Sequence, residues 1–494
     1  MRLEQDRPHR RTAGLLGIVA LALAIEVAVS LILISKGRDA LVRTAWEGDS
    51  GGYVNLAKTL IDGVQRPTYR AVGYPLFLAA SLLAGGQQWG LPLAVGIQLL
   101  LNVALVVLFC RYLQHLIPDV RTWETTLLSM VLLLGGLGTA LWLMSDFQAG
   151  LLFAIAMYCL VCRKGRWGTT VGGLAACCLI LTRPSFSALP VLLLVCALVL
   201  RRSAWRIPVA QLIFYITFSA LGLGVNWYRQ TKSASDLQNG YLAKFADAVA
   251  VKKFRPAGET TDAWFYQEGA AIAGRPWDDL TRRERDDYAL RALAQHVRRQ
   301  PVRFAIGSAV TFVKYTFVPL ENAVGSVFSV LSLRYPTWLR VLLAALFLPL
   351  WLLMLIPPLR DRRFLPYYFA VVVLFVYEVG VSALDSAQGE RIRFPLLFVM
   401  LPLVIVNLRS LASLVRVRRS GATLVHREVK SVEVRNSSSR ELCGMTTSWF
   451  KGGGMEYAKM LWVLPGLMSV SARISEQPPR TSAATSEDML DAVE

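Results

Sequence analysis

The sequence predicts an all-α protein that crosses a membrane several times. The chain has 494 residues, of which 54% are hydrophobic and only 18% are charged, and its mean hydropathy is +0.44. A soluble protein of ordinary composition carries about 25% charged residues. Long apolar runs recur along the chain, and the arginines and lysines fall in short clusters between them. Such clusters are typical of the cytoplasmic loops of membrane proteins.

The formal net charge of +19 has the same explanation. In a soluble protein this excess would point to nucleic acid, but here it follows the positive-inside pattern, and we expect no nucleic-acid partner.

The cysteines and histidines predict no metal site. Cys159 and Cys162 have metal or redox spacing, but both lie inside an apolar run and no His or Cys pair completes a zinc site.

The first apolar segment, 13–34, follows a basic N-terminus and is long enough to span a bilayer. This order predicts that residues 1–12 are cytoplasmic. Glu26 lies inside the segment, where a carboxylate facing lipid would be costly, so we expect it to face other helices. A hydrogen bond between helices and a role in a site both explain Glu26 equally well.

Ten segments in all have the composition of a membrane span, with both chain ends cytoplasmic: 13–34, 91–114, 124–144, 147–162, 168–182, 186–200, 207–227, 337–358, 365–384 and 394–411. Two further apolar segments, 72–84 and 302–318, are short or interrupted by charge, and we expect them in the outer interface. If 72–84 spanned instead, the basic clusters at 163–166 and 201–206 would both move outside, against the positive-inside rule.

These spans define a membrane domain at 13–414, with extracytoplasmic loops at 36–90 and 228–336. The second loop contains the capping box Thr281-x-x-Glu284, which predicts a helix over 281–299. Residues 415–494 are polar and mixed in composition, and we expect a disordered cytoplasmic tail.

The stretch 46–78 gathers the residue types that chemistry at a membrane surface needs. Glu47 and Asp49 stand among glycines before an amphipathic run that begins near Tyr53. Arg70 and the segment GYPLF follow. A carboxylate can accept a proton from a hydroxyl, and an arginine can hold a phosphate through two hydrogen bonds. The plain alternatives are a helix N-cap for the acid and a headgroup contact for the arginine.

This stretch resembles the first outer loop of the GT-C glycosyltransferases, the fold of protein O-mannosyltransferases and of lipid A aminoarabinose transferase. The resemblance is carried by Gly48-Asp49, Tyr53, Leu56-Ala57, Gly63, Arg70 and Gly73-Tyr74-Pro75-Leu76-Phe77. Val72 stands where many members have proline. Three weaker motifs agree: Ser145-Asp146, Leu181-Thr182-Arg183-Pro184, and Gly389-Glu390-Arg391-Ile392-Arg393-Phe394-Pro395, in which Ile392 replaces the usual aromatic residue. The resemblance covers about residues 10–411.

The resemblance implies a membrane enzyme that transfers a hexosyl or pentosyl group from a polyprenyl-phosphate donor. The acceptor would be a hydroxyl of a glycan, lipid or protein, and the site would face outward from the plasma membrane, the inner membrane of a bacterium. It implies Asp49 as general base, with Glu47 as the alternative base or a partner. The remaining roles it implies are donor phosphate binding by Arg70, Arg183, Arg391 and Arg393, and substrate binding by Tyr53, Tyr74 and Asp146. No cofactor is implied with certainty, although Glu47 and Asp49 could share a divalent cation.

Two other classes of function remain open. A transporter or flippase of lipid-linked glycans would favour broken helices, charges near the middle of the membrane and two similar halves. A glycan polymerase would have a large outer loop, which residues 228–300 permit. The polar residues of this chain fall mainly in the predicted outer loops and no two halves are evident, which favours the transferase.

Overall fold

The computed structural model describes residues 7–35, 37, 42, 50–63, 71–163, 165–200, 206–232, 241–256, 263–317, 328, 334, 336–358, 361–385 and 394–413. The chain divides into two compact units, 1–418 and 419–494, and all the described residues belong to the first. Every regular element among them is a helix, and these residues contain no strand. The predicted all-α class is confirmed, whereas the predicted tail, 415–494, lies outside the described residues.

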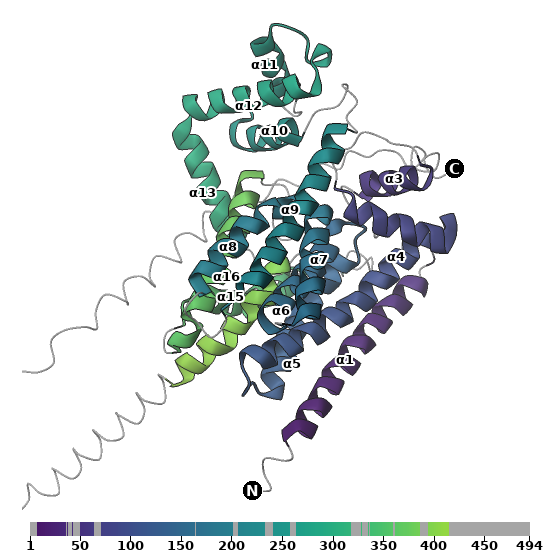
Figure 1. The fold of residues 1–494 in the computed structure, drawn as a ribbon, viewed down its shortest axis with the longest axis vertical. Coiled ribbons are helices and arrows are strands. Elements are labelled where there is room, and N and C mark those ends of the chain that lie inside the picture. The colour runs from purple at the N-terminus through teal and green to yellow at the C-terminus, as the bar shows by residue number, and fades with distance from the viewer. Residues whose placement is uncertain are drawn as a thin grey trace, which may run out of the picture. The chain divides into compact units, whose positions relative to one another are not determined.

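Figure 1 shows the helices. The first half of the chain forms α1 (Arg7–Ser35), α3 (Ser50–Ile61), α4 (Gly73–Leu116), α5 (Thr122–Ala140), α6 (Ser145–Cys162), α7 (Arg166–Thr182), η1 (Pro184–Ala188) and α8 (Leu189–Leu200). The second half forms α9 (Val209–Lys232), α10 (Tyr241–Phe254), α11 (Ala263–Ala273), η2 (Trp277–Asp279), α12 (Arg282–Arg299), α13 (Pro301–Phe317), α15 (Thr337–Leu355), η3 (Arg362–Phe364), α16 (Leu365–Asp385) and a last helix, Phe394–Ser413.

Eight helices in the described part of the chain are long and apolar enough to cross a membrane, and they match eight of the ten predicted spans. The chain is therefore a multi-pass membrane protein. The other two predictions, 168–182 and 186–200, form shorter helices. The first is α7, with 17 residues, and the second is divided between η1 and α8, which has 12 residues. About 20 residues are needed to span the hydrocarbon core.

The predicted boundary between 72–84 and 91–114 falls at a break in α4. Gly86 has φ 64° and ψ −174°, while the residues on both sides of it are helical. This backbone conformation is essentially restricted to glycine. Gly86 therefore divides α4 into two helical rods, and the interfacial position of the first rod stays a prediction.

Buried amide side chains close the C-terminal ends of four helices. At the end of α5, Gln98 donates to Ala140 O (2.8 Å) and Trp142 O (3.1 Å). Gln211 donates to Cys159 O of α6 (3.0 Å), and Asn226 donates to Ile180 O of α7 (2.7 Å). At the end of α15, Asn407 donates to Leu353 O and Ile356 O (both 2.8 Å). The last carbonyls of a helix have no partner within it, and a membrane supplies no water to replace one. These amides therefore satisfy polar groups that would otherwise be costly to bury.

Glu26 faces other helices, as the sequence predicts. It is 2% exposed, and Asn102 of α4 donates a hydrogen bond of 2.6 Å to its carboxylate. Asn102 also donates to Leu133 O of α5 at 3.1 Å, so one amide connects three helices. Of the two explanations that the sequence left open, the contacts support a hydrogen bond between helices.

A charged cluster ties the last helix to the turn between α4 and α5. The guanidinium of Arg409 donates to the Glu124 carboxylate at 2.7 and 3.1 Å and to the Asp119 carboxylate at 2.8 Å. Two hydrogen bonds to one carboxylate fix both distance and orientation. The contact anchors the Phe394–Ser413 helix at its C-terminal end.

Exposed tryptophans mark both ends of the bundle. Trp123 (55% exposed) and Trp167 (85% exposed) begin α5 and α7, beside the basic residues 121 and 166. Trp227 (69% exposed) follows Asn226, which closes the opposite end of α7. Tryptophan is enriched where a membrane meets water. This distribution agrees with a bundle that crosses a bilayer.

A second hydrophobic core lies among the described residues of 241–317. Phe254, Trp264 and Phe265 lie in this second cluster with alanines of α10 and α12. The predicted helix 281–299 is confirmed as α12. The Thr281 amide donates to the Glu284 carboxylate at 2.9 Å, and the Glu284 amide donates to Thr281 Oγ1 at 3.4 Å, which completes the predicted capping box. We call residues 241–317 the α10–α13 module.

Candidate functional site

Four of the nine predicted site residues lie in the described part of the chain, and the structure brings them together. Tyr53, Tyr74, Asp146 and Arg183 come from α3, α4, α6 and the end of α7. Aromatic, ionic or electrostatic interactions connect them. The other five predicted residues lie outside the described residues: Glu47, Asp49, Arg70, Arg391 and Arg393.

Tyr53 connects α3 to two other helices. Its ring meets that of Tyr74 edge to face, with 5.3 Å between centroids and 87° between the planes. Its hydroxyl lies 3.1 Å from Ser145 Oγ, within hydrogen-bond distance, at the first residue of α6. The amphipathic face of α3 buries Leu56 and Ala57, which directs the Tyr53 ring toward the bundle. The sequence predicted this helix near Tyr53, and it begins at Ser50.

Asp146 and Arg183 form a buried ion pair. Their side chains are 5% and 6% exposed, and Arg183 Nη1 donates to Asp146 Oδ1. Asp146 lies in the first turn of α6, where the helix dipole favours a negative charge. Burial acts to lower the pKa of Arg183, but the carboxylates of Asp146 and Glu378 outweigh it, so the pKa of the guanidinium is raised. Arg183 is therefore a fixed positive charge inside the protein.

Sequence reasoning missed Glu378. This residue of α16 is 1% exposed and interacts electrostatically with Arg183. The neighbouring Tyr377 hydroxyl donates to the Ser185 carbonyl and so attaches α16 to η1. The sequence did contain a sign of this role. Glu378 is the only acid in the apolar run 365–384, and an acid there is costly in a membrane and usually pairs with another group. Glu378 therefore adds a second acidic side chain that interacts electrostatically with the Arg183 guanidinium.

Two of the motifs that carry the family resemblance touch each other. A Cβ atom built on Gly73 would lie 2.5 Å from Thr182 Oγ1 and 2.9 Å from the Thr182 backbone nitrogen. Gly73 begins the GYPLF segment, and Thr182 precedes Arg183. Only a residue without a side chain allows α4 and α7 to approach this closely.

The end of the late motif also reaches α6. The Phe394 ring stacks on Phe147 with 6.1 Å between centroids, and it packs directly over Gly150. Phe394 follows Arg393 in the chain, just as Ser50 follows Asp49 and Ala71 follows Arg70. Ser50, Ala71 and Phe394 are all at most 4% exposed. The described neighbours of three predicted site residues, Asp49, Arg70 and Arg393, are therefore buried.

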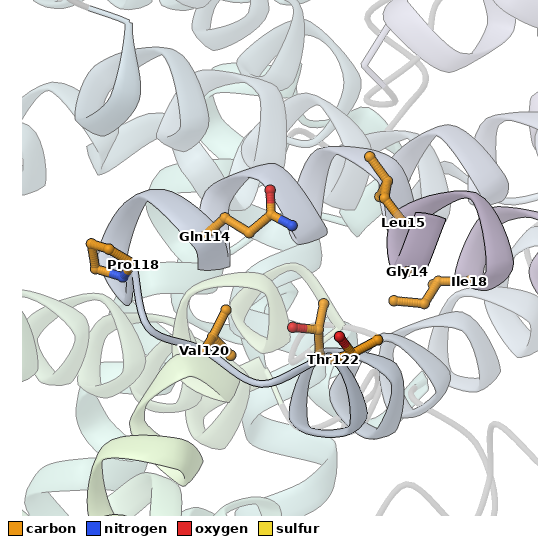
Figure 2. A pocket seen from close by; sticks show the side chains of 8 residues that line it. Gly14, Leu15, Ile18, Gln114, Pro118, Val120 and Thr122 are labelled. Carbon is orange, nitrogen blue, oxygen red and sulfur yellow. The ribbon is translucent and has the colours of Figure 1, made fainter. Parts of the chain in front are cut away.

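Figure 2 shows a small cavity and the side chains that line it. It has a volume of about 20 Å³ and is lined by residues of α1, the end of α4 and the start of α5, including Gly14, Gln114 and Thr122. A volume of this size holds about one water molecule. Gln114 and Tyr74 are at opposite ends of α4, so this cavity is not part of the candidate site.

The described residues contain no group of three or more His, Cys, Asp or Glu side chains that could hold a metal ion. Asp146, the predicted substrate-binding acid, is instead paired with the guanidinium of Arg183. The two acids that could share a divalent cation, Glu47 and Asp49, lie outside the described residues.

No family model, curated protein or solved structure matches this chain. An assignment of function therefore rests on the residues and their arrangement.

Proposed function

We propose that this protein is an integral membrane glycosyltransferase of the GT-C type, which transfers a sugar from a polyprenyl-phosphate donor to an acceptor hydroxyl outside the cell membrane. One observation carries the proposal. Three separate sequence motifs that resemble a single family contribute Tyr53 and Tyr74, Asp146, and Arg183 to one cluster of contacting side chains. This convergence of motifs that lie far apart in the sequence supports the proposal.

The proposed reaction divides its work between an acid and several arginines. The acceptor oxygen attacks the anomeric carbon while the bond from that carbon to the donor phosphate breaks, and the phosphate leaves with the bonding electrons. Asp49 accepts the hydroxyl proton. An unperturbed Asp has a pKa of about 3.9 and is a weak base. A weak base suffices when the bond from the anomeric carbon to the phosphate breaks before the new bond to the acceptor oxygen is well formed. The acceptor hydroxyl then becomes acidic only late in the reaction, when its proton is easily removed.

The departing phosphate gains charge, which arginines stabilise. We propose Arg70, Arg391 and Arg393 as the residues that contact it. The burial of Arg183 and its pairing with Asp146 favour a positioning role for this residue, because a guanidinium that is 6% exposed is covered by protein. In that role the pair holds the start of α6 to the end of α7, beside Ser145, whose hydroxyl lies within hydrogen-bond distance of the Tyr53 hydroxyl.

The test is transfer from radiolabelled polyprenyl-phosphate sugars in membranes with and without the protein. We expect radioactivity to enter an acceptor fraction only in membranes that contain the protein, and the Asp49→Asn variant to lose the transfer. Absence of transfer from a panel of hexosyl and pentosyl donors, with the protein correctly inserted, would reject the proposal.

A transporter of lipid-linked glycans is the second candidate, because two carboxylates are buried within candidate spans. Glu26 and Glu378 are 2% and 1% exposed, and acids inside membrane helices often belong to substrate or proton pathways. Proteoliposomes that contain a fluorescent lipid-linked glycan distinguish the candidates. A transporter moves the glycan between leaflets without breaking its phosphate bond, whereas a transferase consumes the donor.

A further inference from the structure

The helix α13 exposes a continuous apolar stripe. Val302, Ile306, Val310 and Val313 are 67%, 59%, 61% and 51% exposed. Their spacing of four, four and three residues places them on one face of the helix. Isolated exposed apolar side chains are ordinary in proteins, but a contiguous stripe marks a surface that binds an apolar partner.

The opposite face of α13 is already occupied. Lys253 of α10 donates to Gly307 O at 2.8 Å and to Thr311 Oγ1 at 2.7 Å. The ring of Phe304 stacks on Phe254, with 6.0 Å between centroids and 10° between planes. These contacts fix the rotation of α13 about its axis. The apolar stripe consequently points away from the module.

The same helix connects the module to the membrane-spanning part of the chain. It packs against α16, and Phe312 contacts the main hydrophobic core. The helix α16 is a candidate span with its own exposed apolar side chains, such as Phe369 (49%) and Val376 (50%). The apolar stripe therefore belongs to a helix that joins the lipid-facing body, as the course of α13 from α12 toward α16 in Figure 1 illustrates.

Basic residues surround the start of the stripe. Arg298 and Arg299 are exposed in the last turn of α12, and Arg303 is exposed in the first turn of α13. Clusters of arginine or lysine beside an amphipathic helix bind the headgroups of anionic phospholipids. This part of the module thus combines an outward apolar face with an exposed basic end.

We infer that α13 is a lipid anchor, which inserts its apolar stripe into a bilayer while Arg298, Arg299 and Arg303 bind anionic headgroups. The partner is the surface of an anionic phospholipid bilayer. This contact holds the α10–α13 module at the membrane through α13. The same anchoring is expected whether the protein is a transferase or a transporter.

The experiment uses the full-length protein in nanodiscs, with a nitroxide label on Ile306→Cys or Val310→Cys. The native cysteines at positions 178 and 443 are replaced first, since Cys178 is exposed. We expect the labels at 306 and 310 to be reached by dissolved oxygen and protected from a water-soluble nickel chelate. A label on Gln295→Cys, an exposed position of α12, should show the reverse.

The headgroup contact is tested by comparing nanodiscs with phosphatidylglycerol and with phosphatidylcholine alone. The paired substitution Arg298→Gln and Arg299→Gln should lower the ratio of lipid-inserted to water-exposed label by roughly tenfold or more in anionic nanodiscs. Arg283→Gln, an exposed arginine at the other end of α12, is the matched control and should change nothing.

Three results would overturn the inference. Equal nickel access at positions 306 and 295 would mean that the stripe faces water. A label at 306 that neither reagent reaches would mean that protein covers it, for instance a second copy of this chain. Equal insertion in both lipid compositions, unchanged by the paired arginine substitution, would exclude the anionic headgroup.

Discussion

Gly73 and Thr182 approach so closely that a single methyl group at position 73 would overlap both the side chain and the backbone of Thr182. The contact joins the start of α4 to the end of α7, next to Tyr74 and Arg183. Because both neighbours belong to the candidate site, the spacing of this contact sets how the aromatic pair and the ion pair lie relative to each other.

We expect Gly73→Ala to destabilise the protein by about 1–3 kcal/mol, the usual cost of overpacking a rigid contact. The measurement is the midpoint of thermal unfolding in detergent. Gly96→Ala, in the same helix, is the control, since a Cβ at that position meets nothing within 4 Å. It should be neutral or stabilise by roughly 0.5–1 kcal/mol, because alanine is the better helix former. Equal effects of the two substitutions would contradict the close contact.

The ion pair predicts a large loss of stability when one partner is removed. Asp146→Asn removes the carboxylate that accepts the hydrogen bond of the buried Arg183 guanidinium. Breaking a buried pair typically costs about 3–5 kcal/mol, and we expect a loss of that size. Replacing both residues, Asp146→Leu with Arg183→Met, should recover much of the loss. A double variant less stable than Asp146→Asn would show that the two charges do not act as a pair.

Asp49→Asn tests the proposed general base. The substitution keeps the size and hydrogen bonding of the side chain but removes its basicity. Transfer should fall by the ~10²–10⁴ typical of a lost general base, while membrane insertion and donor binding stay near normal. A helix cap would behave differently, because Asn caps about as well as Asp. Wild-type transfer by Asp49→Asn would therefore reject the catalytic role.

Glu47→Gln is the matched control for that experiment. If Asp49 is the base, this variant should retain most of its transfer activity. If Glu47→Gln alone abolishes transfer, the base is Glu47.

Arg391→Ala and Arg393→Ala should each weaken use of the donor more than folding. A lost hydrogen bond from a charged group costs about 1.5–3 kcal/mol, which is roughly a tenfold to hundredfold rise in the donor concentration needed for half-maximal transfer. The thermal unfolding midpoint is measured in parallel. Normal transfer by both variants at limiting donor would leave these arginines only the role of anchoring a helix end.

The positive-inside pattern predicts which side of the membrane each loop occupies. A cysteine at position 240 should react with a membrane-impermeant maleimide added outside, whereas a cysteine at position 165 should not. Gly165 suits the experiment, since it precedes α7 and a Cβ there meets nothing within 4 Å. Labelling at 165 without labelling at 240 would overturn the topology and, with it, the extracytoplasmic position of the site.

Features that depend on a short stretch of chain could be read from the sequence. The membrane class follows from the length of apolar runs, and α12 follows from its capping box, because each is decided by neighbouring residues. The separation of the apolar segments 72–84 and 91–114 was also visible in the sequence, although only the backbone angles locate the break in α4 at Gly86.

Four site residues were predicted singly, from their likeness to motifs, and the sequence assigned no contact between any two of them. Neither the pairing of Arg183 with Asp146 nor the electrostatic interaction of Glu378 with Arg183 could be derived from spacing. The same holds for the amides that close helix ends, such as Asn407 on α15.

The physical reason is that a membrane interior lacks water, so every buried polar group must find its partner within the protein. Apolar length alone determines that a segment enters the membrane. Which polar side chain meets which depends on how helices distant in sequence pack, and several pairings would satisfy the same pattern. For this protein the sequence by itself determined the membrane class and most of its spans. The tertiary structure alone decided which of the predicted residues contact one another, with Tyr53 against Tyr74 and Arg183 paired with Asp146.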